Sequence, residues 1–105
     1  MNEKEQLEFA AKAAGIKGEM SQTIGGWPCI ITGAYQPWQP THDNGDALWL
    51  AAQLKMDIAQ FSFGVRVNAP DGEDHYQPVN DGDDRCAALR LAITSAAAEI
   101  GKAMT

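Results

Sequence analysis

His42, Asp43 and Asp46 lie within five residues of one another and are the side chains best suited to chemistry by type and spacing. If a helix begins here, His42 and Asp46 are four residues apart and share one helix face. An imidazole and two carboxylates can bind a divalent metal. Aspartates also satisfy the free amides of a first helical turn, which is their commoner role. We therefore assign no catalytic residue, metal or cofactor to this cluster.

Basic residues are missing from a long part of the sequence, because no Lys or Arg occurs between Lys17 and Lys55. An anionic ligand bound in this part of the chain would have to take its cations from Arg66, Arg85 or Arg90. The sequence also lacks a phosphate-binding loop, a dinucleotide fingerprint and a nucleophile elbow. These observations disfavour the enzymes and nucleotide-binding proteins that carry such motifs.

Aromatic and proline residues surround the histidine and aspartates, in the sequence AYQPWQPTHDNGDALWLAAQL. If Trp27, Tyr35 and Trp38 are exposed, they form an aromatic recognition surface. If they are buried, they cover the open end of the hydrophobic core. The first alternative gives a candidate binding site that comprises Tyr35, Trp38, Gln39, Pro40, Thr41, His42, Asp43 and Asp46.

The chain is acidic, with 14 Asp and Glu against 8 Lys and Arg and a formal net charge of −6. Direct nucleic-acid binding is disfavoured, because phosphates are bound by Lys and Arg with release of counterions. The acidic groups either keep the protein soluble or bind a basic protein surface. A candidate acidic surface comprises Asp71, Glu73, Asp74, Asp81, Asp83 and Asp84.

The 105 residues predict a single domain, residues 1–105, of mixed α+β class. Apolar spacing and capping residues give the order α-β-α-β-β-α. We expect an α/β/α-type sandwich in which the helices pack on one small antiparallel or mixed sheet, with Pro78 on an edge strand. The predicted elements are a helix from the N-cap Asn2 to Ala14, strand 29–32, a helix to Leu54 with Thr41 or Asp43 as N-cap, strands 57–67 and 73–80 joined by a turn at 69–72, and helix 83–102.

The second predicted helix is apolar on nearly all sides, since only Gln53 is polar between Ala47 and Leu54. Such a helix is covered by a second layer or by another chain. We therefore expect a homodimer that forms through Leu48 and Trp49. In the last helix, the expected buried stripe comprises Cys86, Leu89, Ile93, Ala97, Ile100 and Met104.

Cysteine usage and hydrophobicity predict a cytoplasmic protein. Cys29 and Cys86 are far apart in apolar settings, which predicts two buried free thiols. The charged, amphipathic N-terminus differs from a signal peptide. No apolar run approaches the ~20 residues needed to span a bilayer, so no membrane contact is expected.

The sequence YQPWQPTHDNGDALWLAAQL resembles the signature of small tailed-phage and prophage proteins of the phage ABA sandwich domain family. Those proteins carry an aromatic residue, Asn-Pro, an acidic loop, and Gly-Asp-Ala-Leu at the start of an apolar helix. Gln39 stands where the family has asparagine. The resemblance implies α-β-α layers, a phage or prophage origin and a bacterial host cytoplasm, and it implies no activity. The matching residues are Trp38, Pro40, Thr41, Asp43, Gly45, Asp46, Ala47 and Leu48.

Three hypotheses for function follow. The leading one is a non-catalytic phage or prophage binding module that acts on a host or phage protein, such as a defence component, through an acidic and aromatic surface. The first alternative is a sponge that binds a nucleotide-derived signal at an oligomer interface. The second alternative is a small metal-dependent enzyme that uses His42, Asp43 and Asp46.

Overall fold

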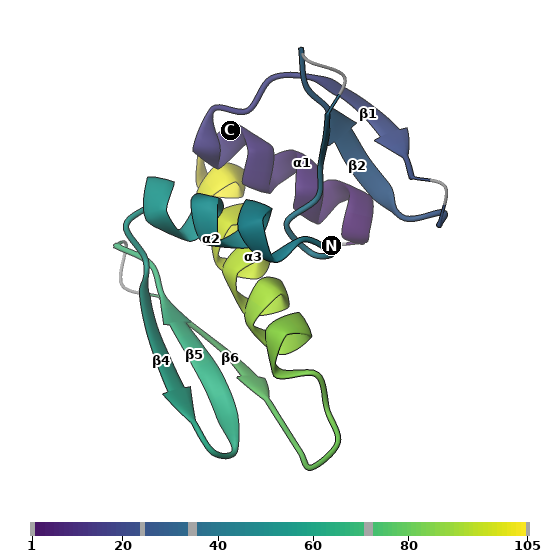
Figure 1. Cartoon of the computed structure of the whole chain (residues 1–105). Coiled ribbons are helices and arrows are strands. Elements are labelled where there is room, and N and C mark those ends of the chain that lie inside the picture. Colours follow the sequence, from purple (N-terminus) through teal and green to yellow (C-terminus); the bar gives the residue numbers. More distant parts are fainter. Residues whose placement is uncertain (1, 24, 34–35, 71–72, 105) are drawn as a thin grey trace.

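Three helices and two small sheets form the described part of the protein, which is residues 2–23, 25–33, 36–70 and 73–104 of a computed structural model (Figure 1). The mixed α+β class predicted from the sequence is confirmed. The elements in chain order are α1 (Glu3–Ala14), β1 (Glu19–Gln22), β2 (Pro28–Ile31), β3 (Pro37–Trp38), α2 (Asn44–Gln53), β4 (Asp57–Phe61), β5 (Gly64–Asn68), β6 (Asp74–Pro78) and α3 (Arg85–Ala103).

The helix boundaries follow from capping residues. The Asn2 side chain accepts a hydrogen bond from the Glu5 amide at 2.8 Å and begins α1. Gly15 ends α1 in the left-handed conformation at φ 73°, which glycine adopts without steric cost. Asp43, and not Thr41, is the N-cap of α2. Asp84 caps α3, one residue later than the predicted start of that helix.

The first sheet is antiparallel, with the order β1-β2-β3. Met20, Ile30 and Trp38 lie opposite one another in the register and therefore share one face. Ile30 and Trp38 belong to the core, and Met20 packs against it. The sequence predicts only the middle strand of this sheet. β1 is mostly polar and β3 has two residues, so neither carries a clear periodic signal.

The second sheet is also antiparallel, with the order β4-β5-β6. The single strand predicted over residues 57–67 is wrong, because Ser62 and Phe63 form a turn that separates β4 from β5. Val65 and Val67 are buried under α3, whereas Phe61 and Phe63 are exposed. The alternation of apolar residues continues through the two-residue turn, so it does not reveal the reversal of the chain. The edge position predicted for Pro78 is confirmed.

α3 is the central helix and packs against α1, α2 and the second sheet. Its alanines allow these close contacts, and Gly101 lies against the Phe9 backbone of α1. The expected burial of Ile93 and Ala97 is confirmed. The expected burial of Cys86 and Met104 is wrong, because Cys86 is exposed in the first turn of α3 and Met104, which caps its C-terminal end, is 56% exposed.

The helices lie between the two sheets, with the first sheet beside α1 and the second beside α3 (Figure 1). This differs from the predicted single sheet with helices packed on it, because β1, β2 and β3 pair only with one another and β4, β5 and β6 form a separate sheet. No described helix is long and apolar enough to cross a membrane. The core of the described residues comprises Leu7, Ala10, Ala11, Ile30, Trp38, Ala47, Leu50, Ala51, Val65, Val67, Val79, Ala92, Ile93, Ala96 and Ala97.

Candidate functional site

Trp38 is part of the core and not of an exposed recognition surface. Its side chain is 5% exposed and lies in β3 beside Ile30. Pro40 is also fully buried. The Trp38 indole N–H is buried and has no hydrogen-bond partner within the described residues. Of the two alternatives for the aromatic residues, burial holds for Trp38, while Tyr35 lies outside the described residues.

Gln39 and the two aspartates hold the segment before α2 in place. The Gln39 side-chain oxygen accepts a hydrogen bond from the Trp27 indole N–H at 2.6 Å. The backbone N–H of Gln39 donates to Asp46 Oδ2 at 3.0 Å. Asp43 Oδ1 accepts from the Asp46 amide at 2.8 Å. Burial raises the pKa of Asp46, the hydrogen bond from the Gln39 amide opposes this rise, and the charge of Asp43 adds to it.

His42 links this segment to the start of α1. Its ring stacks on Trp27 with 4.5 Å between the ring centroids and an interplanar angle of 19°. Its Nε2 atom lies 3.1 Å from Glu3 Oε1, and the Thr41 hydroxyl donates to the same oxygen at 3.4 Å. The three residues singled out for metal binding thus have separate partners. The described residues contain no group of three or more His, Cys, Asp or Glu side chains that could hold a metal ion.

Arg90 supplies the cation that the sequence lacks near this segment. It reaches from α3, donating from Nε to the Thr41 carbonyl oxygen at 3.0 Å and from Nη1 to Asn44 Oδ1 at 2.6 Å. Its Nη2 atom lies 4.0 Å from Asp84 Oδ2. The sequence indicated Arg90 only as one of three cations that could reach this part of the chain. Its hydrogen bonds to Thr41 and Asn44 were not predicted, because Arg90 lies 49 residues beyond Thr41. Because two of the guanidinium nitrogens already donate to Thr41 and Asn44, fewer N–H donors of Arg90 remain to bind a phosphate.

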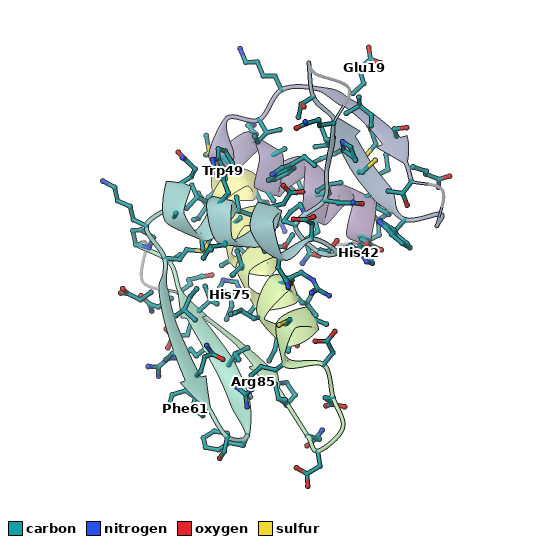
Figure 2. All side chains as sticks on the ribbon, in the orientation of Figure 1. Glu19, His42, Trp49, Phe61, His75 and Arg85 are labelled. Atoms are coloured by element: carbon teal, nitrogen blue, oxygen red, sulfur yellow. The ribbon has the colours of Figure 1, made fainter. Side chains whose placement is uncertain are left out.

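Three exposed aromatic residues lie on the second sheet and its β4–β5 turn, while a fourth, Trp49, is 40% exposed on α2. Phe61 and Phe63 stack with 5.3 Å between ring centroids and are 36% and 62% exposed. Tyr76 is 47% exposed and donates its hydroxyl hydrogen to the Phe63 carbonyl oxygen at 3.1 Å. The Arg66 guanidinium carbon lies 5.7 Å from the Phe61 ring centroid, within cation–π range. Figure 2 shows Phe61 near the lower end of the molecule, away from Trp49 and His42.

An acidic loop is tied to the same end of the molecule. The Val79 amide donates to the Phe63 carbonyl oxygen at 2.9 Å, and Arg85 Nη2 donates to the Phe61 carbonyl oxygen at 2.8 Å. The Asn80 amide donates to the carboxylate of Asp83. We call the exposed side chains of this end the tip surface, which comprises Phe61, Phe63, Tyr76, Asp81, Asp83 and Asp84.

The remaining acidic candidates lie at the other end of β6. Glu73 and Asp74 are exposed, and Asp74 accepts a hydrogen bond from the Asn68 side chain across the strand pair. Asp71 lies outside the described residues. The predicted acidic surface is therefore divided, with Asp81, Asp83 and Asp84 at the tip. The three exposed aromatic residues beside them were not among the sequence candidates. Phe61 and Phe63 were assigned to the interior of one predicted strand, 57–67, and Tyr76 to the next predicted strand, 73–80.

Comparison of the chain with family models, with curated proteins and with solved structures finds no match. The geometry of the described residues is therefore the basis for assigning a function.

Proposed function

We propose that this protein is a non-catalytic binding module whose tip surface binds a basic protein partner. The observation that carries the proposal is the placement of three exposed aromatic side chains beside three exposed carboxylates. Aromatic residues dominate the energy of protein interfaces because they bury a large area at low entropic cost. Phe63 is the most exposed of the three and is the expected centre of the contact.

The charges at the tip indicate the chemistry of the partner. Asp81, Asp83 and Asp84 precede α3, and Arg85, the nearest cation in sequence, donates to the carbonyl oxygens of Phe61 and Ser62. Arg90 Nη2 lies 4.0 Å from Asp84 and partly offsets its charge, so the exposed carboxylates of Asp81 and Asp83 contribute most to favouring a partner that carries Lys or Arg around an apolar depression. Complementary charge at such a rim raises the association rate and makes it sensitive to salt.

The resemblance to phage ABA sandwich proteins supports a biological setting for this proposal. A small phage or prophage protein would meet its partner in the cytoplasm of a bacterial host. The partner would be a host or phage protein, and inhibition of a defence component is one such role. The Asp43 to Leu48 part of the resemblance forms the start of α2, so it concerns the architecture and does not define the contact surface.

A binding experiment with matched variants tests the proposal. Proteins captured from host lysate would be identified, purified, and titrated against the protein and its variants. We expect Phe63→Ser to weaken binding about tenfold or more, as for an interface residue worth over ~1.4 kcal/mol. Met104→Ser is the control, because Met104 is 56% exposed and lies at the C-terminal end of α3.

The charge at the tip needs a separate variant. Asp81→Lys should weaken binding most at low salt, and the difference from the unaltered protein should shrink as salt screens the charges. A purified partner that binds Phe63→Ser and Asp81→Lys as tightly as the unaltered protein would contradict the proposal, and so would the recovery of no partner.

A further inference from the structure

β4 is an edge strand whose outer side is free in the described chain. It pairs with β5 on one side, and no described strand pairs with the other. Figure 1 shows it at the outer border of the sheet. The opposite edge is interrupted by Pro78, whereas the sequence of β4, DIAQF, contains no proline or lysine that would prevent pairing. An edge of this kind can accept a further strand.

Exposed apolar side chains lie along the same edge. Ile58 lies on the inner face of β4, opposite the buried Val67. Leu48 of α2 is 66% exposed. These two side chains, together with Cys86 and Leu89 of α3, line a cavity of about 220 Å³ between β4 and the helices. A strand added to β4 would cover part of this apolar surface.

We propose that β4 pairs antiparallel with β4 of a second copy of the chain, about a two-fold axis at Ala59. The proposal goes beyond the binding of a basic partner and does not depend on it. In this register Ala59 faces Ala59 of the second copy, Ile58 faces Gln60, and Asp57 faces Phe61. A two-fold axis at one residue of an edge strand gives a closed, isologous interface.

The backbone favours this register over its neighbours. Phe61 and Gly64 flank a two-residue turn, so they form a hydrogen-bonded pair between β4 and β5. Alternation along the ladder then directs the amide and carbonyl groups of Ile58 and Gln60 toward the free edge. A two-fold axis at Ala59 places these groups opposite one another in the two copies, and each finds a partner.

Charge complementarity favours a second copy as the occupant. Asp57 and Phe61 lie on the outer face of the sheet, on the same side as Arg66. Because the Arg66 guanidinium extends over the Phe61 ring, the Asp57 carboxylate of the second copy comes close to it. Two-fold symmetry forms this Asp57–Arg66 pair twice. These pairs allow an acidic chain to associate with itself at this edge despite its net charge.

Disulfide crosslinking tests the register. Ala59→Cys would be made in a Cys86→Ser background, because Cys86 is exposed and Cys29 is buried. Directly opposed residues of paired strands have Cβ atoms about 4.5–5.5 Å apart, which is close enough for a disulfide after a small adjustment. Gln60→Cys in the same background is the control, since its two thiols would be offset along the strands and point to the other face. We expect a covalent dimer from Ala59→Cys and little from Gln60→Cys.

Charge reversal tests independently whether the strand that pairs with β4 comes from a second copy of the chain. We expect the unaltered protein to show a concentration-dependent dimer by sedimentation at about 100 μM, where an interface with a Kd of ~1 μM is well populated. Asp57→Arg and Arg66→Asp should each weaken the dimer about tenfold, and the double variant should restore much of it. Circular dichroism would confirm that each variant is folded.

Three outcomes would overturn the proposal. The first is a monomer at about 100 μM, well above the assumed ~1 μM Kd. The second is equal crosslinking of the Ala59→Cys and Gln60→Cys variants. The third is a dimer that both single charge reversals leave intact but Trp49→Ser abolishes, which would place the interface on α2.

Discussion

Asp46 shows how a single partly buried carboxylate makes stability depend on pH. Its pKa is raised above the ordinary value of 3.8, chiefly by burial. The folded protein therefore binds this proton more tightly than the unfolded chain does. The resulting contribution to stability is fully present below pH 3.8 and is lost as pH rises through the raised pKa of the folded state.

The variant Asp46→Asn should remove this dependence. Asparagine keeps an oxygen that can accept from the Gln39 amide, but it does not ionise. Urea unfolding would be measured for both proteins from about pH 3 to pH 7, the range in which a raised carboxyl pKa acts. We expect the stability of the unaltered protein relative to Asp46→Asn to fall as pH rises. Asp81→Asn controls for the loss of one negative charge, and a constant or rising difference would contradict the prediction.

At the candidate site, sequence reasoning succeeded where the interaction is local. Asp43 was one of two predicted N-caps because a capping side chain bonds an amide three residues later. The link between Gln39 and Trp27, 12 residues apart, leaves no comparable pattern in the sequence. Arg90 reaches Thr41 only because α3 packs beside α2. Contacts that depend on tertiary packing could not be predicted from one sequence.

At the scale of elements, the close packing of α1 on α3 depends on Gly101. A Cβ atom at this position would overlap the carbonyl oxygen of Phe9, which belongs to the backbone of α1 and cannot rotate away. We expect Gly101→Ala to lower the free energy of unfolding by about 1–3 kcal/mol, as overpacking usually does. This loss should occur even though alanine favours a helix by about 1 kcal/mol.

Urea denaturation measures this effect, with Gly33→Ala as the control. A Cβ atom at Gly33 meets nothing within 4 Å, so that variant should change stability by less than about 0.5 kcal/mol. If Gly101→Ala were as stable as the unaltered protein, the two helices would have to be further apart than in this structure.

Long elements with capping residues at their ends were predicted from the sequence, whereas short elements without such residues were not. α1 was predicted from Asn2 to Gly15, because both ends carry residues with a specific capping geometry. β1 and β3 were missed, since one is polar and the other has two residues. The turn at Ser62 and Phe63 was missed because neither of its two central residues is the Gly, Asn or Asp that two-residue hairpin turns favour, although Gly64 follows them. That omission also concealed the tip surface.

At the scale of the whole molecule, the two sheets depend on the helices between them. Ile30 of the first sheet and Val65 of the second both belong to the core, which also contains Leu7, Leu50 and Ile93 from the three helices. Each sheet has only three strands, and separation from the helices would expose its apolar face to water. Neither sheet should therefore persist when the helices separate.

We therefore predict that both sheets unfold in one cooperative step. Hydrogen exchange measured by mass spectrometry would follow peptides that cover β2 and β5, at a protein concentration low enough to exclude self-association. Their slowest amides should open with the same free energy, roughly 5–10 kcal/mol for a chain of this size. Protection in β5 that exceeded protection in β2 by several kcal/mol would contradict this, because the first sheet and α1 would then open as a separate unit while the second sheet stayed folded on α3.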